Sequence, residues 1–129
     1  MKIFPKIALT LCAALCSASV LAAWGAIVVN DTRDDDADDT YYTTWIDAPS
    51  EAEATSRAMS ACRADYREVG LSASGCRTVA TFRRCAAYAV NRTQFGAGTS
   101  SLLSGAERDA LSMCSRRDCK IVISLCNSD

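Results

Sequence analysis

Two seven-residue stretches decide the fold: Trp24-Gly25-Ala26-Ile27-Val28-Val29-Asn30 and Cys85-Ala86-Ala87-Tyr88-Ala89-Val90-Asn91. Each stretch has the composition of a short apolar strand and ends in asparagine. Two further correspondences follow in the same order along the chain, pairing residues 58–62 with 110–114 and residues 76–80 with 119–123. Three matches in one order indicate that the chain repeats a structural unit.

The repeated unit is predicted to run strand, strand, helix, strand, because β-branched and aromatic residues occupy the strand positions. The expected elements are 24–30, 41–46, 50–69 and 76–82 in the first half, and 85–91, 93–98, 104–115 and 119–125 in the second. Two such units predict an α+β domain in which a mainly antiparallel sheet carries both helices on one face.

Both expected helices have a start signal. Ser50 with Glu53, and Ser104 with Glu107, show the spacing of a capping box, in which two side chains bond each other's backbone amides. Narrow stripes of alanine then recur at helical spacing. Because the side chains in these stripes are small, we expect both helices to lie close to the sheet.

The N-terminal segment has the order of a signal peptide: Lys2 and Lys6, then an apolar stretch, then small residues up to Ala22. We therefore predict cleavage after Ala22, with Ala23 as the nearest alternative, a single mature domain over residues 23–129, and a periplasmic or secreted location. After cleavage no stable membrane insertion is expected.

Two other interpretations of this segment are open. A lipoprotein anchored through Cys16 would need a very small residue just before the cysteine, and Leu15 stands there. An uncleaved transmembrane anchor could use the apolar stretch 7–29, although residues 24–30 are better used as a strand.

The charge balance disfavours nucleic acid as a partner. The full chain has 14 basic and 15 acidic residues, and Lys2 and Lys6 leave with the signal peptide, so the mature net charge is about −3. The charges are also segregated: residues 23–50 hold seven acids against Arg33, whereas residues 51–129 hold eleven bases against eight acids.

Six cysteines remain after cleavage, and an oxidising compartment favours three disulfides, although six cysteines alone allow fifteen connectivities. Each expected helix ends in a cysteine and the following strand begins with one. This arrangement favours Cys62–Cys76 and Cys114–Cys119, and leaves Cys85–Cys126 to join the two halves. A zinc site is the competing interpretation, but the chain has no histidine and no Cys-x-x-Cys pair, so no metal is expected.

The sequence resembles a bacterial domain-of-unknown-function family, numbered 4189. The resemblance covers nearly all of the mature chain: the opening 24–29, the alanine-rich helices that end at Cys62 and Cys114, residues 76–79 and 85–90, and the close from Cys119 to Asn127. It implies export and the fold, and no catalytic activity. The chain departs from the family pattern in a long acidic insertion, 31–40, and in Tyr41-Tyr42-Thr43-Thr44, which stands where the second strand is expected to carry glycine.

The chemistry available to the chain argues against an enzyme and against a cofactor. Histidine is absent, and cysteines held in disulfides cannot act as thiolates. A serine–lysine pair would have to use Lys120, the only mature lysine, which is expected to be a solvated residue at a strand edge. Glu51 and Glu53 remain as a possible carboxylate pair for a small secreted hydrolase or effector, although Glu53 already has a capping role.

The acidic insertion is the first candidate for contact with a partner, through the carboxylates of Asp34, Asp35, Asp36, Asp38 and Asp39. Alternation of Asp34, Asp36 and Asp38 resembles a calcium loop. However, no glycine follows for the turn, and Trp45 occupies the twelfth position, where a glutamate is needed. A solvated hairpin tip is therefore the favoured interpretation.

Two basic pairs lie close to cysteines, Arg83-Arg84 and Arg116-Arg117. They can serve surface solubility or recognise an acidic partner, and Arg83 and Arg84 are retained as candidate contacts. The prediction as a whole is a non-enzymatic exported binding protein of the inhibitor or immunity type, acting on an unknown protein partner.

Overall fold

The computed structural model describes residues 23–30, 40–115 and 117–128. The elements follow in the order β1 (Trp24–Asn30), β2 (Tyr41–Ala48), α1 (Glu51–Glu68), β3 (Cys76–Phe82), β4 (Cys85–Val90), β5 (Phe95–Ser100), α2 (Leu103–Cys114) and β6 (Lys120–Cys126). This confirms the α+β class and the repeated strand, strand, helix, strand unit. Within the described ranges, neither helix is long and apolar enough to span a membrane.

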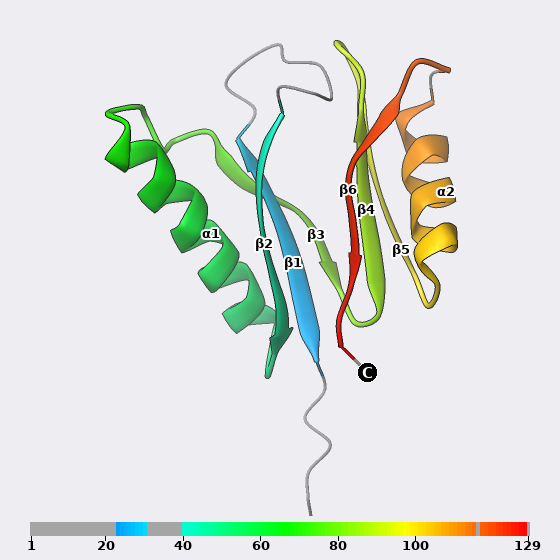
Figure 1. The fold of residues 1–129 in the computed structure, drawn as a ribbon, viewed down its shortest axis with the longest axis horizontal. Helices are drawn as coiled ribbons and strands as arrows, with labels where there is room; N and C mark the ends of the chain where they lie inside the picture. Colours follow the sequence, from blue (N-terminus) through cyan, green and yellow to red (C-terminus); the bar gives the residue numbers. More distant parts are fainter. Residues whose placement is uncertain (1–22, 31–39, 116, 129) are drawn as a thin grey trace, which may run out of the picture.

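The two halves form two separate three-stranded antiparallel sheets, ordered β2-β1-β3 and β5-β4-β6. In each half the first strand is central and its two neighbours are edge strands. Figure 1 shows the two sheets face to face, with α1 outside the first sheet and α2 outside the second. The molecule is therefore a four-layer sandwich of helix, sheet, sheet and helix.

The prediction of one sheet with both helices on one face is wrong. Both faces of the central strands are apolar, because alternate residues of a strand point to opposite faces. In β1, Ala26 and Val28 pack beneath α1, whereas Ile27 and Val29 face the other sheet. A helix covers only one face, so the second apolar face is buried by packing the two sheets together.

Three clusters make up the core, one at each interface between layers. The central cluster joins Ile27, Val29 and Phe82 of the first sheet to Tyr88 and its neighbours on the second sheet. The two outer clusters lie beneath the helices and consist mainly of alanine and disulfide cysteine. These small side chains confirm that the helices lie close to their sheets.

The helices nevertheless meet their second strands differently. In β5 an added Cβ on Gly96 would lie 2.3 Å from the Cys114 nitrogen, and one on Gly98 would lie 2.4 Å from the Ala106 oxygen. Register with the central strands makes Thr43 and Trp45 of β2 the equivalents of these glycines. There the Thr43 Oγ1 donates a 2.7 Å hydrogen bond to the Ala58 carbonyl, so side chains separate α1 from β2.

Three disulfides are present: Cys62–Cys76, Cys85–Cys126 and Cys114–Cys119. All three favoured pairings are thus confirmed, and two of them tie a helix to the strand that follows it. The expectation that Cys85–Cys126 joins the halves is wrong, because both cysteines belong to the second sheet. They face each other directly across β4 and β6 with a Cα–Cα distance of 4.0 Å.

Only one of the two predicted helix caps forms. Ser50 is the N-cap of α1, and its Oγ accepts a 3.1 Å hydrogen bond from the Glu53 amide. Helix α2 begins one residue earlier than predicted, with Leu102 as an N-cap that has no side-chain bond. The carboxylate of Glu107 instead accepts a 2.8 Å bond from the Ser124 hydroxyl of β6, which is a contact between the helix and its sheet.

Candidate binding surface

The turn between β3 and β4 connects the two sheets and carries the predicted contacts Arg83 and Arg84, both exposed. The Arg83 guanidinium carbon lies 4.7 Å from the centroid of the half-buried Trp24 ring, at the start of β1. A guanidinium over an indole face is attracted by the ring's electron density. Trp24, Arg83 and Arg84 are called the Trp–Arg surface below.

A single buried side chain fixes the backbone of this turn. The Asn127 Nδ2 donates to the carbonyls of Phe82 at 3.3 Å and Arg83 at 2.9 Å, and the Asn127 backbone amide donates to the Arg84 carbonyl at 2.8 Å. Three successive carbonyls of the turn are thus held by one residue. Asn127 is only 9% exposed, so water competes little for these bonds.

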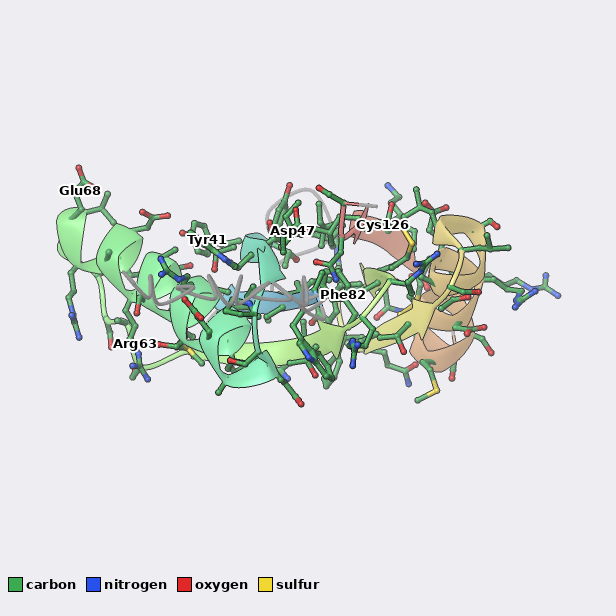
Figure 2. The ribbon with its side chains drawn as sticks, turned by 90° about the horizontal axis from the view of Figure 1, so that it is seen from below. Tyr41, Asp47, Arg63, Glu68, Phe82 and Cys126 are labelled. Atoms are coloured by element: carbon green, nitrogen blue, oxygen red, sulfur yellow. A yellow bond between two sulfur atoms is a disulfide. The ribbon has the colours of Figure 1, made fainter. Side chains whose placement is uncertain are left out.

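The same asparagine reaches the first sheet as well. Its Nδ2 also lies 3.4 Å from the Ala23 carbonyl, and its Oδ1 accepts a 2.9 Å bond from the Asp47 amide. Asp47 has a left-handed φ of 60°, a conformation that aspartate tolerates better than most residues. Its carboxylate accepts bonds from the amide and the hydroxyl of Ser128 at 2.8 and 2.7 Å. Figure 2 shows this end of the molecule, with Asp47 and Phe82 labelled.

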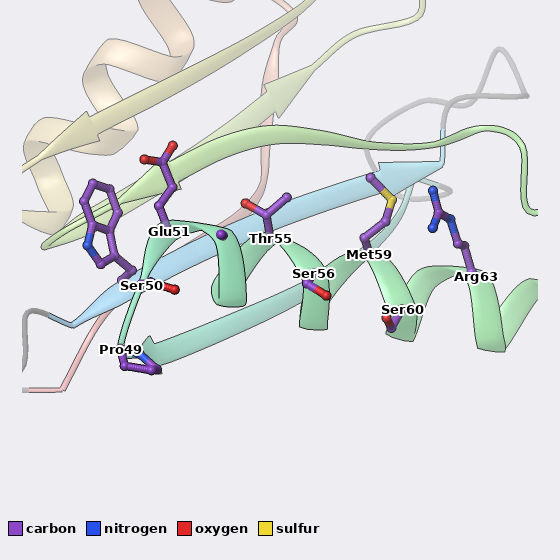
Figure 3. Close-up of a pocket in the computed structure, with 10 residues that line it drawn as sticks. Pro49, Ser50, Glu51, Thr55, Ser56, Met59, Ser60 and Arg63 are labelled. Carbon is purple, nitrogen blue, oxygen red and sulfur yellow. The ribbon is translucent and has the colours of Figure 1, made fainter.

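Two hollows adjoin the Trp–Arg surface and share Trp24 as a wall. The smaller, of about 260 Å³, lies between the β3–β4 turn and β5 and is lined by both arginines and by the hydroxyl residues Thr99 and Ser100. The larger, of about 860 Å³, is an open groove that follows α1 from Pro49 to Arg63. Figure 3 shows the larger hollow, which is called the α1 groove below.

The walls of the α1 groove are mixed in character. Trp24 and Met59 contribute apolar surface, and the hydroxyls of Ser56 and Ser60 lie exposed beside them. Arg63 stands at the far end from Trp24. A surface of this kind, with an aromatic anchor between polar groups, is typical of a protein-binding site.

A second cluster joins the start of β2 to the end of α1. The Tyr41 hydroxyl donates a short hydrogen bond to Asp65, and its ring meets the Tyr66 ring edge-on at a centroid distance of 4.9 Å. Desolvation by burial, followed by the bond to Asp65, raises the pKa of Tyr41 well above its ordinary value. This cluster fastens β2 to the helix, and none of its three residues lines the α1 groove.

The other predicted contacts fall partly outside the described residues. Asp34, Asp35, Asp36, Asp38 and Asp39 all do, and so do the predicted signal peptide and Arg116. Arg117 is exposed just before β6. Of the candidate contacts, the structure therefore describes Arg83 and Arg84.

The residues considered for catalysis have structural contacts. The Glu51 carboxylate accepts a 2.9 Å bond from the Thr81 hydroxyl, and the Glu53 carboxylate accepts bonds of 3.1 and 3.0 Å from Arg57. Lys120 is exposed at the start of β6, as expected of a strand-edge residue. Within ranges 23–30, 40–115 and 117–128, no group of three or more histidine, cysteine or acidic side chains could hold a metal ion.

Sequence reasoning missed the contributions of Trp24 and Asn127. Trp24 could have been suspected, because it is the one aromatic residue in a predicted strand whose other residues are glycine, aliphatic residues and a final asparagine. Asn127 gave no signal, since its partners lie 44 and 45 residues away at the turn and 80 residues away at Asp47.

Comparison with known proteins gives one match. The profile of a domain of unknown function, DUF4189, matches residues 24–126. No curated protein and no solved structure matches the chain.

Proposed function

The chain belongs to the DUF4189 family, as its cysteine and alanine pattern predicted, and we propose that it is a non-enzymatic binding protein exported to the bacterial periplasm or exterior. We assign it the inhibitor or immunity type, in which a rigid surface occupies a site on a partner protein. The contact surface in this proposal is the Trp–Arg surface, which recognises an acidic patch.

One observation carries the proposal: Arg83 is held over Trp24 on a turn whose carbonyls are bonded to Asn127. Tryptophan and arginine are the residues most enriched among those that dominate binding energy. Because the backbone is fixed before contact, little conformational freedom is lost on binding. The three disulfides restrict the scaffold further.

The chemistry of the described residues supports binding ahead of catalysis. The sequence has no histidine, the mature cysteines are paired, and Glu51 and Glu53 contact Thr81 and Arg57. The disulfides also fit an oxidising compartment, which supports export.

The test is capture of a partner from envelope extract by the immobilised mature chain. A double variant, Arg83→Ala with Arg84→Ala, should lose about tenfold or more of the affinity for the captured protein, because two central contacts are removed. The matched control is Arg92→Ala with Arg108→Ala, which changes the net charge equally. Arg84 precedes β4, whereas Arg92 lies after the other end of that strand, and Arg108 is an exposed residue of α2.

Capture by the unchanged chain should also weaken as salt rises, because the contact is electrostatic. If the captured protein is an enzyme, adding equimolar mature chain should inhibit it, and the double variant should not. Equal affinity of the double variant and its control for the captured protein would refute the proposal.

A further inference from the structure

The lining of the α1 groove follows the helix in two parallel rows. Glu51, Thr55, Met59 and Arg63 are spaced by four residues, and Ala52, Ser56 and Ser60 form the neighbouring row. Residues four apart lie one above the other on a helix. Figure 3 shows Glu51, Thr55, Met59 and Arg63 following one another along one side of α1. At a rise of 1.5 Å per residue the groove is about 18 Å long.

Resting on the proposed function, we propose that the α1 groove and the Trp–Arg surface together bind an extended segment of the partner protein. An extended chain advances about 3.3 Å per residue, so the groove accommodates about five or six residues. A carboxylate of the segment binds Arg83 and Arg84, and an apolar side chain packs between Trp24 and Met59.

The charges along the groove specify the segment further. Arg83 and Arg84 stand at one end and Arg63 at the other, and the Glu51 carboxylate, bonded to Thr81, lies between them. The bound segment therefore needs a negative charge at each end, facing the arginines. An acidic residue above Glu51 is disfavoured by repulsion between the two carboxylates. The expected ligand has acidic residues at its ends and an uncharged, apolar centre.

A polypeptide also fits the polar part of the lining. The exposed hydroxyls of Ser56 and Ser60 can each donate and accept a hydrogen bond, which matches the alternating carbonyls and amides of an extended backbone. The length and the open side of the groove suit a chain that enters and leaves it, whereas a compact ligand is usually enclosed on most sides.

The proposal is tested with a labelled peptide and the mature chain. The peptide acetyl-Asp-Ser-Leu-Leu-Ser-Asp-amide has a palindromic sequence and uncharged ends, so either chain direction presents the same charges, and acetyl-Asn-Ser-Leu-Leu-Ser-Asn-amide is its uncharged control. Fluorescence anisotropy should show the acidic peptide binding about tenfold more tightly than the control. Equal binding of the two peptides, or no binding of either at about 1 mM, would overturn the proposal.

A pair of variants at one site provides the matched comparison. Ser56→Glu with Ser60→Glu should weaken binding of the acidic peptide several-fold, and Ser56→Lys with Ser60→Lys should strengthen it. Both positions are exposed, so melting curves should show that both variants fold. If Ser56 and Ser60 had only a structural role, both double variants would change the affinity for the acidic peptide in the same direction. That result would contradict the proposal.

The same variants separate this inference from the proposed function. Partner capture that depends on Arg83 and Arg84 but not on the charge at positions 56 and 60 would retain the proposed function and exclude the groove as the peptide site.

A glycan is the other occupant to examine, because Trp24 offers an aromatic face. Displacement of the peptide by an uncharged oligosaccharide such as chitohexaose would assign the groove to glycans and overturn the peptide proposal.

Discussion

Replacing Asn127 by alanine should destabilise the folded chain far more than an average surface substitution does. The change removes the Nδ2 bonds to the β3–β4 turn and to Ala23, and the Oδ1 bond to the Asp47 amide. The amide group has two hydrogens to donate, so about three full hydrogen bonds are lost, each worth roughly 1 kcal/mol. Buried carbonyls left without a donor add to the loss. We expect destabilisation of about 2–4 kcal/mol.

Equilibrium unfolding in urea, followed through the fluorescence of Trp24 and Trp45, measures this loss. With a slope of about 1–3 kcal/mol per molar urea, the midpoint should fall by roughly 0.7–4 M. Asn91→Ala is the control, because Asn91 also makes several side-chain bonds but in an exposed loop. A midpoint shift for Asn127→Ala no larger than that of the control would refute the reasoning.

Four further predictions concern processing, disulfides, charge and pH. Mass spectrometry of exported protein should find a chain that begins at Ala23, or at Trp24 if the alternative cleavage site is used, with six hydrogens fewer than the reduced form; an intact N-terminus or free thiols would contradict it. Cys85→Ser should leave Cys126 unpaired and destabilise the fold by about 2–5 kcal/mol, whereas an unchanged urea midpoint would show that the bond contributes little. The acidic insertion is expected to meet a basic region of the partner that is separate from the acidic patch bound by Arg83 and Arg84, so neutralising the insertion should leave the melting temperature almost unchanged and weaken partner capture at low salt only; equal capture by both forms would remove the insertion as a contact. The substitutions are Asp34→Asn, Asp35→Asn, Asp36→Asn, Asp38→Asn and Asp39→Asn. Because the pKa of Tyr41 is raised on folding, its stabilising bond to Asp65 should be fully present below about pH 10 and be lost as the pH rises further; a stability difference from Tyr41→Phe that grows above pH 10 would contradict this.

The elements of the fold could be predicted because their signals are local. Strands β1 and β3 begin and end where expected, since alternating or continuous apolar residues stop at Asn30 and Phe82. The prediction for β5 was two residues too early, because Asn91 Oδ1 accepts bonds from the Thr93 and Gln94 amides and holds these residues in a turn. Local hydrogen bonds of this kind shift a boundary without changing the hydrophobic pattern.

The layering was predicted wrongly because it depends on which surfaces meet in space. A continuous apolar run such as Ile27-Val28-Val29 indicates burial on both faces. It does not say whether the second face meets a helix or another sheet.

The candidate site was only half predictable for a similar reason. Arg83 and Arg84 were singled out by their charge, and they do lie together on an exposed turn. The pairing of Arg83 with Trp24, and the hydrogen bonds of Asn127, join segments from both ends of the folded domain. No local pattern encodes such contacts, so they became visible only in three dimensions.

The difference between the two second strands bears on how much substitution each half of the molecule tolerates. Both copies of the repeated unit pack a helix against a sheet, but they do so through different contacts. In the second copy Gly96 and Gly98 admit the helix backbone so closely that almost any side chain is excluded there, which leaves little freedom to diverge. In the first copy Thr43 and Trp45 separate the strand from its helix, and Trp24 stands where Cys85 of the second copy is committed to a disulfide. Substitution beside the helix is thus tightly limited in the second copy, whereas the first copy accepts larger side chains at the equivalent positions.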